Sequence, residues 1–368
     1  MPKHNHRAHS RQPAAWSHNI ANTWKTLRLG QRIFAVFVAL CIAFTSGMYG
    51  IALWYQHSLR DQPLRYGMTF IPRYARQLGV DPQQTLDAMI YDLGLRQFRL
   101  VSYWNIHEAQ QNVYDFSELD WQFEKINRAG GKVSLAIGLR QPRWPECHMP
   151  TWAERMTKPQ WSAALKTYIR QVVERYKDNP ALESYQLENE YFMKVFGDCP
   201  DHTRERLVDE FSLVKALDPK HPVIVSRSNN WVGVPLYAPL PDVVGISVYK
   251  RVWDTTITKR YFEYPLPPWF YASLGGIGKI LTDRDLIIHE LQSEAWLPPD
   301  GFSMNNPSDI PEQNKSLDAK RLRERLTYAR DTGLREIYLW GGEWWYWRKT
   351  VAKDPTLWNA ARQELRKQ

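Results

Sequence analysis

The sequence lacks the short motifs that would place its chemistry at a nucleotide, a zinc ion or a serine nucleophile. Neither G-x-G-x-x-G nor G-x-x-x-x-G-K-[ST] occurs, and the G-x-S-x-G turn of many serine hydrolases is also missing. The dipeptide His-Glu occurs at residues 107–108 and 289–290. A zinc protease helix needs a second histidine four residues after the first, where this chain has Gln111 and Ser293. We therefore expect no metal and no organic cofactor.

Acidic residues are absent from the first 32 residues, and this absence explains most of the net charge. The 368-residue chain has a formal charge of +9, and six of its Lys and Arg residues lie within residues 1–32. Without these six charges the rest of the chain carries +3. The basic excess therefore belongs to a tail and does not indicate a nucleic-acid-binding surface. The tail is polar, and we expect it to be a disordered cytoplasmic segment.

Charge of either sign is absent from residues 33–55, IFAVFVALCIAFTSGMYGIALWY. A helix of about 20 apolar residues spans a bilayer core. The basic residues before it place the N-terminus in the cytoplasm and the rest of the chain outside. The alternative is a signal peptide cleaved near Gly50-Ile51-Ala52, but this run exceeds the apolar core of about 7–15 residues found in such peptides. We predict a transmembrane signal anchor at 33–55, in contact with the lipid bilayer.

Beyond the anchor we predict a linker at 56–65 and an extracytoplasmic domain at 66–368, held at the cytoplasmic membrane by a single pass. Cysteine is scarce in this part of the chain. Cys41 lies in the apolar segment, and only Cys147 and Cys199 follow it. An oxidising compartment permits a disulfide between these two residues. Two unrelated free thiols are the alternative.

Short apolar runs alternate with helical patterns from residue 66 onward, without internal repeats. This alternation indicates a parallel sheet, and eight such units in about 300 residues predict an α/β fold of the (β/α)₈ TIM barrel type. A doubly wound open sheet is the alternative. Residues 250–280 show little helical pattern, and we expect a long aromatic loop there. The candidate strands are 66–71, 97–104, 132–139, 183–190, 222–228, 242–249, 285–290 and 336–342, and the candidate helices are 82–93, 119–129, 159–177, 203–217 and 317–332.

Acidic side chains stand at the carboxyl ends of the fourth and seventh candidate strands, where barrel enzymes carry their active sites. Glu190 ends the fourth strand and Glu290 ends the seventh, and these strands face each other across an eight-stranded barrel. Two carboxyl groups about 5–5.5 Å apart suit a retaining glycosidase, in which one donates a proton and the other attacks the sugar. Two unrelated solvated acids are the alternative.

Three neighbouring residues complicate this interpretation. Strand alternation places Glu188 and Glu190 on one face and Asn189 on the other, unless a bulge or the end of the strand intervenes. Glu294 rivals Glu290 as the nucleophile, although Glu290 ends the apolar run. Glu343, at the end of the eighth strand, is expected to be an exposed loop carboxylate.

Four segments, in order, resemble the clan of (β/α)₈ glycoside hydrolases that carry an acid/base and a nucleophile on strands 4 and 7. QLENEY (186–191) and YWNIHEAQQNVYDFSELD (103–120) are similar to the Q-[IL]-[ED]-N-E-Y and W-N-x-H-E-P-x-x-G-x-Y-D-F-S-x-x-D segments of family 35 and family 42 β-galactosidases. PRWPECHMPTW (142–152) resembles their loop after strand 3. IIHELQSEAW (287–296) resembles their nucleophile strand.

The resemblance implies a role for individual residues. Glu190 would be the acid/base, Asn189 would bind the sugar 2-hydroxyl, and Glu290 would be the nucleophile. Arg99 would hold the nucleophile ionised and Tyr249 would orient it. Further expected substrate contacts are Trp104, His107, Glu108, Trp144, Glu294, Trp296 and Trp340, with Trp340 as the floor of the subsite. Additional candidate stacking platforms are Trp152, Trp253, Trp269, Trp344 and Trp345.

The sequence therefore predicts a membrane-anchored retaining glycoside hydrolase acting on a β-linked oligo- or polysaccharide. A transglycosidase that remodels envelope glycans and a catalytically silent carbohydrate-binding barrel are the alternatives. In a barrel, Cys147 and Cys199 follow neighbouring strands, so a disulfide between them would brace the loop that carries Trp144.

Overall fold

The computed structural model describes residues 28–228 and 236–367. Residues 1–27, which make up most of the predicted tail, lie outside the described residues. The chain divides into two compact units, Met1–Gly50 and Ile51–Gln368. The second unit contains the last turns of the apolar helix as well as the whole of the predicted extracytoplasmic domain.

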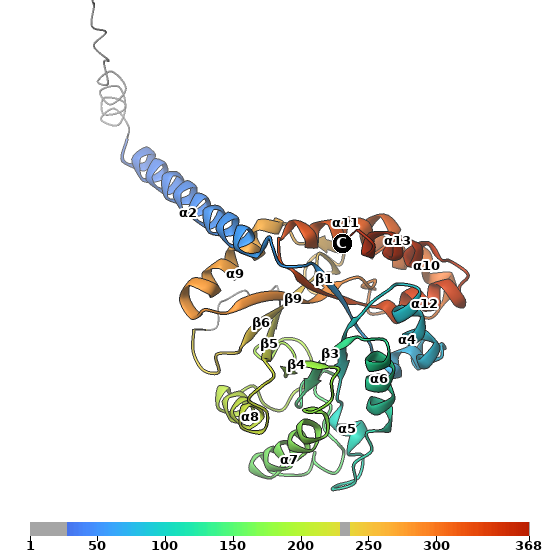
Figure 1. Ribbon diagram of the computed structural model, residues 1–368. Helices are drawn as coiled ribbons and strands as arrows, with labels where there is room; N and C mark the ends of the chain where they lie inside the picture. The colour runs from blue at the N-terminus through green and yellow to red at the C-terminus, as the bar shows by residue number, and fades with distance from the viewer. Residues whose placement is uncertain (1–27, 229–235, 368) are drawn as a thin grey trace, which may run out of the picture. The chain divides into compact units, whose positions relative to one another are not determined.

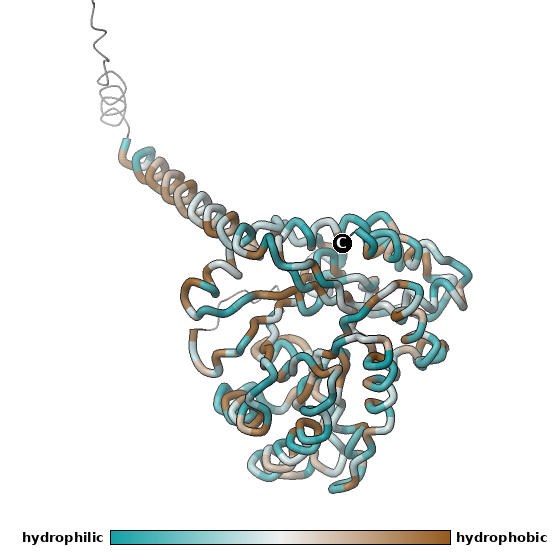
Figure 2. Tube along the Cα trace, in the orientation of Figure 1, coloured by the Kyte–Doolittle hydropathy of each residue, from teal (hydrophilic) through white to brown (hydrophobic). Residues whose placement is uncertain are grey.

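Helix α2 (Leu29–Leu59) contains the apolar segment and is long and apolar enough to cross a membrane. Figure 2 shows its predominantly hydrophobic colouring. A signal sequence close to an N-terminus meets the same criterion of length and composition. The helix continues through the first four residues of the predicted 56–65 linker, because it ends only at Leu59.

Eight parallel strands form a closed barrel in the order β1-β10-β9-β6-β5-β4-β3-β2. The predicted TIM barrel is therefore confirmed, and each candidate strand overlaps one strand of the barrel. Their apolar runs are buried on both faces, as parallel strands covered by helices require. The strands are β1 (Arg65–Thr69), β2 (Gln97–Val101), β3 (Lys132–Ile137), β4 (Leu182–Leu187), β5 (Val223–Ser228), β6 (Val243–Val248), β9 (Asp285–Gln292) and β10 (Glu336–Trp340).

Helices surround the barrel and cover the outer face of its strands (Figure 1). In the longest of them after α2, a capping box at Thr157 and Gln160 fixes the start, and residues such as Leu165 and Ile169 are buried. The helices are α3 (Pro72–Gln77), α4 (Pro82–Tyr91), α5 (Trp104–His107), α6 (Ser117–Arg128), α7 (Lys158–Tyr176), α8 (Arg204–Leu217), α9 (Pro268–Thr282), η1 (Pro307–Asp309), α10 (Ile310–Ser316), α11 (Ala319–Asp331), α12 (Gly342–Thr350) and α13 (Thr356–Leu365).

The expectation of an irregular loop over residues 250–280 is wrong. This segment forms a hairpin of β7 (Arg251–Trp253) and β8 (Tyr261–Glu263), followed by α9. Glycine has a low helix propensity, and α9 contains several glycines. A Cβ atom on Gly275 would lie 2.3 Å from the Tyr55 ring. Close packing against α2 therefore explains a helix that intrinsic propensity disfavours.

The last turns of α2 belong to the packing of the barrel unit. The Tyr55 hydroxyl lies 3.2 Å from Asp285 Oδ1, to which it donates, and it accepts the Leu286 N–H at 3.0 Å. Gln56 Nε2 donates to the carbonyl of Thr332 at 3.0 Å. These bonds fix residues 51–59 to the amino-terminal end of β9 and to the end of α11.

Replacing Tyr55 with Phe should lower the free energy of unfolding by about 1–3 kcal/mol, because the Leu286 N–H would lose its buried acceptor. Thermal unfolding of the full chain in detergent, followed by circular dichroism, measures the change. Tyr91→Phe is the matched control, since Tyr91 is 68% exposed. Equal melting temperatures for both variants would show that the Tyr55 hydroxyl contributes nothing.

Candidate active site

The carboxyl end of β4 departs from strand alternation immediately after Leu187. Glu188 has a φ of 56° and Glu190 a φ of 43°, both in the left-handed region that non-glycine residues rarely adopt. The strand therefore ends before its acidic residues. Asn189 and Glu190 consequently share the inner side of the barrel end, while the side chain of Glu188 turns toward the end of β3 and α8.

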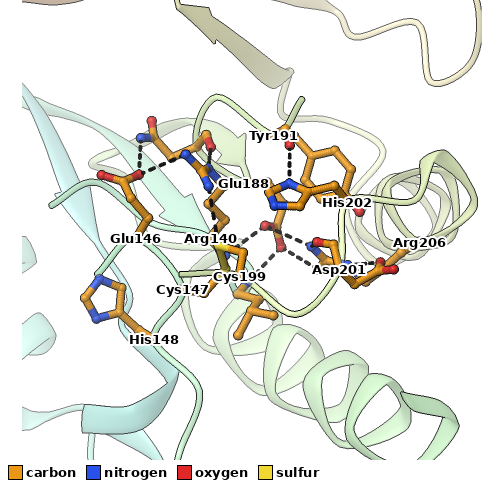
Figure 3. Close-up of a disulfide and its surroundings, with 12 residues drawn as sticks. Arg140, Glu146, Cys147, His148, Glu188, Tyr191, Cys199, Asp201, His202 and Arg206 are labelled. Carbon is orange, nitrogen blue, oxygen red and sulfur yellow. Dashed lines mark hydrogen bonds and ion pairs between the residues drawn. A yellow bond between two sulfur atoms is a disulfide. The ribbon is translucent and has the colours of Figure 1, made fainter. Parts of the chain in front are cut away.

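Glu188 is a structural carboxylate. Its oxygens accept the N–H groups of Leu139 at 2.7 Å and of Arg140 at 2.8 Å, and they pair with Arg206 of α8 at 3.0 Å. Gly138 allows this approach, since a Cβ atom there would lie 2.4 Å from the Glu188 carboxylate. Figure 3 shows Glu188 between Arg140 and Arg206. The acid that alternation placed in the site thus joins the ends of β3 and β4.

Glu190 is buried, and its backbone N–H donates to Ser226 Oγ at 2.9 Å. Burial raises the pKa of its carboxyl to about 7, and the negative charge of nearby Glu290 adds to the effect. A protonated Glu190 is therefore available near neutral pH. The structure brings together the two acids that the sequence singled out, Glu190 after β4 and Glu290 on β9.

Glu290 is surrounded by hydrogen-bond donors. Arg99 Nη1 lies 2.5 Å from its Oε2, and the Tyr249 hydroxyl donates to its Oε1. Arg99 and Tyr249 thus occupy the positions beside Glu290 that the resemblance implies. A guanidinium and a phenol are complementary to an ionised carboxylate, so Glu190 and Glu290 have opposite environments.

A bulge in β9 directs Glu290 into the barrel. Ile246 of β6 pairs with Ile288, but the next residue, Ser247, pairs with Glu290, so His289 is the extra residue. His289 Nε2 lies 3.1 Å from Ser134 Oγ, which places this ring inside the barrel as well. Burial lowers the pKa of His289 well below its usual value, and Arg99 adds to this, so the ring is neutral.

Both the oxygen and the nitrogen of the Asn189 side-chain amide make hydrogen bonds. Its Oδ1 accepts Arg99 Nη2 at 2.8 Å and Gln186 Nε2 at 3.1 Å. Its Nδ2 donates to Glu146 Oε2 at 3.1 Å. Arg99 therefore connects Glu290 on β9 with Asn189 after β4.

Glu146 is a third acid in this site that the sequence interpretation missed. It is 4% exposed, and burial raises its pKa to about 8, with Glu190 and Glu290 adding to the effect. The sequence offered one indication, because Glu146 directly precedes Cys147 in the loop after β3. Nothing in its residue type distinguished it from other loop carboxylates.

Cys147 and Cys199 form a disulfide with their Cα atoms 5.1 Å apart (Figure 3). The bond joins the loop after β3 to the loop after β4. Asp198 N–H also donates to the Pro145 carbonyl at 3.0 Å. The two loops that carry Glu146 and follow Glu190 are therefore connected covalently and by hydrogen bonding.

Glu294 lies in a separate cluster. Arg143 Nη2 donates to its carboxylate at 2.8 Å, and the Tyr74 hydroxyl donates to the same group. The Arg143 guanidinium is stacked 3.2 Å from the centre of the Tyr74 ring and 4.6 Å from that of Trp340. One face of Trp340, the expected floor of the subsite, is therefore covered by Arg143.

The expectation that Glu343 is an exposed carboxylate is wrong. Glu343 is 2% exposed, and it accepts the Ile71 N–H at 2.6 Å. Burial raises its pKa to about 7. Glu343 lies at the start of α12, directly after β10, and its side chain points toward the residues that follow β1.

Trp104, His107 and Glu108, which the resemblance places in contact with substrate, make hydrogen bonds within the loop after β2. All three are buried, and the Trp104 indole N–H donates to Glu108 Oε2 at 2.7 Å. Glu108 Oε1 accepts the Asn112 N–H at 2.8 Å, and His107 Nδ1 bonds the Asp115 carbonyl at 2.8 Å. These contacts stabilise the loop after β2.

Four of the expected aromatic platforms fall into two groups. Trp296 packs edge-on against Tyr249, with ring centroids 5.6 Å apart, and also approaches Phe196. Phe196 in turn contacts Trp144, which is 67% exposed. An aromatic path thus leads from the residue that bonds Glu290 to the surface. Trp344 and Trp345 are fully buried in α12 and cannot stack on a ligand.

The remaining candidate platforms lie at other places. Trp152 is half-buried and its indole N–H donates to the Glu108 carbonyl at 2.9 Å. Trp253 lies in the β7–β8 hairpin against Tyr261, and Trp269 lies in the first turn of α9. In residues 28–228 and 236–367, no group of three or more His, Cys, Asp or Glu side chains is arranged to hold a metal ion.

Replacing Glu188 with Gln should lower the free energy of unfolding by about 3 kcal/mol, because a buried arginine loses an anionic partner. Chemical denaturation of the full chain measures this. Glu174→Gln is the matched control, since its side chain is 46% exposed and pairs with Arg170 at the surface. If the two variants lost equal stability, the Glu188 charge would be unimportant for the fold.

Comparisons with known proteins were made for the sequence and for the fold. No family model matches the chain. β-Galactosidase 11 of Arabidopsis thaliana is 27% identical over 116 residues, which cover 27% of this chain and 14% of that protein.

Among solved structures, the β-galactosidase of the Antarctic haloarchaeon Halorubrum lacusprofundi has a TM-score of 0.51 at 15% identity, covering 75% of this chain and 52% of that chain. A family 5, subfamily 18 glycoside hydrolase from Streptomyces cattleya, solved with GlcNAc, has a TM-score of 0.55 at 13% identity, covering 83% and 80%. The exo-β-1,4-mannosidase of Opitutaceae bacterium strain TAV5 has a TM-score of 0.53 at 15% identity, covering 75% and 51%.

The chain thus spans about half the length of the haloarchaeal and Opitutaceae enzymes and most of the Streptomyces protein. At these identities the likeness concerns the fold. The closed parallel barrel resembles those of β-glycosidases from families 2, 5 and 42, which is the resemblance that the sequence motifs indicated.

Proposed function

We propose that the protein is a retaining glycoside hydrolase that acts on a β-linked saccharide, with Glu190 as the acid/base and Glu290 as the nucleophile. One observation carries this proposal: the two acids share one site but have opposite surroundings. Burial and like charge favour a proton on Glu190, whereas Arg99 and Tyr249 donate to Glu290. A double displacement needs this division between a neutral acid and an ionised nucleophile.

The first step cleaves the glycosidic bond. Glu190 donates its proton to the leaving oxygen while the Glu290 carboxylate attacks the anomeric carbon and forms a covalent glycosyl ester. In the second step the Glu190 carboxylate takes a proton from water. The resulting hydroxide oxygen bonds to the anomeric carbon, and Glu290 leaves as a carboxylate. Glu190 is then protonated again, and no other reagent is consumed.

Glu290 is preferred over Glu294 as the nucleophile on the basis of contacts. Glu294 is occupied by Arg143 and Tyr74, and it does not receive the bonds from Arg99 and Tyr249. Arg99 also bonds Asn189, so the nucleophile and the residue expected to bind the sugar 2-hydroxyl are positioned by one side chain.

A β-linked oligo- or polysaccharide is the proposed substrate class. Two of the similar enzymes named above, the β-galactosidase and the exo-β-1,4-mannosidase, carry a β-linkage in their names, and the Streptomyces enzyme was solved with GlcNAc. The path of Trp296, Phe196 and Trp144 provides rings on which further sugar units could stack.

We further propose that α2 is a single-pass anchor with the N-terminus in the cytoplasm and the barrel outside the membrane. Its length and apolar composition support this arrangement. The Cys147–Cys199 disulfide supports an oxidising compartment for the barrel.

Glu190→Gln and Glu290→Gln should each lower kcat by about 10²–10⁴, because each removes a group that acts on the reacting atoms. A panel of p-nitrophenyl β-glycosides, assayed with the full chain in detergent, measures the loss, and NMR of the first-formed product should detect the β anomer. Glu154→Gln, an exposed acid near the same loop, is the control. A wild-type protein that binds saccharides without turnover would support the silent-barrel alternative.

The pH profile should show activity lost on the alkaline side. The pKa of Glu190 is raised to about 7, and a general acid works only while it is protonated, so kcat/KM should fall as the pH rises through this value. Initial rates between acidic and alkaline pH on the best glycoside of the panel give the profile. Undiminished kcat/KM at high pH would contradict the assignment of Glu190.

A further inference from the structure

Backbone hydrogen bonds within the loop after β3 hold Glu146 in place. Gln141 N–H donates to the Glu146 carbonyl at 2.7 Å, and Glu146 N–H donates to the Arg143 carbonyl at 2.9 Å. Glu146 has a φ of 72°, a backbone conformation that glutamate rarely adopts. A tight loop with such a backbone fixes the direction of the Glu146 side chain.

The loop after β4 packs against Glu146 from the other side. A Cβ atom on Gly197 would lie 2.6 Å from the Glu146 Cβ, so only glycine allows this approach. The disulfide of Cys147 with Cys199 holds the two loops in this position (Figure 3). The carboxyl of Glu146 is therefore directed at the residues that follow β4.

The amide of Asn189 is the group that Glu146 meets there. Its Oδ1 already accepts from Arg99 and Gln186, which defines the amide orientation. An amide nitrogen carries two hydrogens. Glu146 Oε2 accepts one of them at 3.1 Å. Because the amide group is planar and its orientation is fixed, the direction of its second N–H is also determined.

The charges that face Glu146 come from three elements. Arg140, after β3, lies 3.7 Å away, and its Nε donates to the Asn189 carbonyl at 2.6 Å. Glu190 after β4 and Glu290 on β9 are the acids that act on it. Burial together with these two acids raises the pKa of Glu146 to about 8, so it accepts the amide hydrogen as a neutral carboxyl near pH 7.

We propose that Glu146 is a positioning residue: its carboxyl holds one N–H of the Asn189 amide so that the other N–H meets the 2-hydroxyl of the sugar attached at Glu290. The inference rests on the proposed function, since it assigns Asn189 a substrate contact. A hydrogen bond to the 2-hydroxyl strengthens in the transition state, so its geometry affects the rate. Glu146 also faces Glu190, whose negative charge favours the neutral form of the Glu146 carboxyl.

The test compares Glu146→Ala and Glu146→Gln in the full chain, with Glu154→Gln as the control. Glu146→Ala should lower kcat/KM about tenfold or more on a p-nitrophenyl β-glycoside, because the amide loses its buried acceptor. On the matching 2-deoxy glycoside the same variant should lose less than about twofold, because no 2-hydroxyl is present to misalign. Equal losses on both substrates would overturn the proposal and leave Glu146 as a brace of the loop.

Glu146→Gln keeps an oxygen acceptor, so it should restore kcat/KM at pH 6 to within about threefold of the wild type. Its alkaline limb should stay at the wild-type position, because Glu146 is already neutral at the pH near 7 where Glu190 loses its proton. An alkaline limb that moves to lower pH by a unit or more would contradict a neutral Glu146 and overturn its role as a neutral acceptor.

If the wild type is inactive on the entire glycoside panel, the proposed function fails, and crystal structures of the wild type and Glu146→Ala decide about Glu146. A rotated Asn189 amide in the variant supports its positioning role. An Asn189 amide that keeps its bonds to Arg99 and Gln186 unchanged would overturn that role independently of any activity.

Discussion

The buried guanidinium of Arg99 is the interaction on which the organisation of the site depends. It extends from β2 into the barrel, where one nitrogen bonds Glu290 on β9 and another bonds Asn189 after β4. A buried charge of this kind is tolerated only when it is paired and hydrogen-bonded. The same bonds that satisfy Arg99 therefore fix the relative position of the two strands that carry the acids, and the hydrophobic barrel around them supplies the low-polarity surroundings in which those bonds are strong.

The structure separates acids that resemble one another in the sequence. Glu188, Glu190 and Glu146 lie within two loops, but Glu188 bonds backbone N–H groups and Arg206, whereas Glu190 and Glu146 face Glu290. Glu294 and Glu343 form part of a second group around Arg143. The environment assigns each carboxyl its role, since the residue type is the same in every case.

The sequence allowed the barrel to be predicted, and Glu190 and Glu290 to be singled out, because both follow from patterns of regular structure. Apolar runs identified the strands, and the carboxyl ends of those runs identified Glu190 and Glu290. The role of Glu188 was not predictable, because strand alternation assumes a regular backbone and the chain leaves it at Leu187. Glu146 was missed for the same physical reason, since its direction depends on a loop with positive φ. Helix α9 was missed because its glycines serve tertiary packing against Tyr55 rather than local propensity.

The bulge at His289 changes which residues of β9 point into the barrel, because it interrupts the regular alternation of side chains. Ile288 pairs with Ile246 of β6, and Glu290 pairs with the next residue of β6, Ser247. The pairing between the two strands therefore shifts by one residue at His289. In a regular strand Ile288 and Glu290 would lie on the same face, whereas the extra residue places Glu290 on the face of its partner Ser247 and turns its carboxylate into the barrel. The direction of the Glu290 carboxylate therefore depends on a local irregularity of β9 that the apolar pattern of the strand does not reveal.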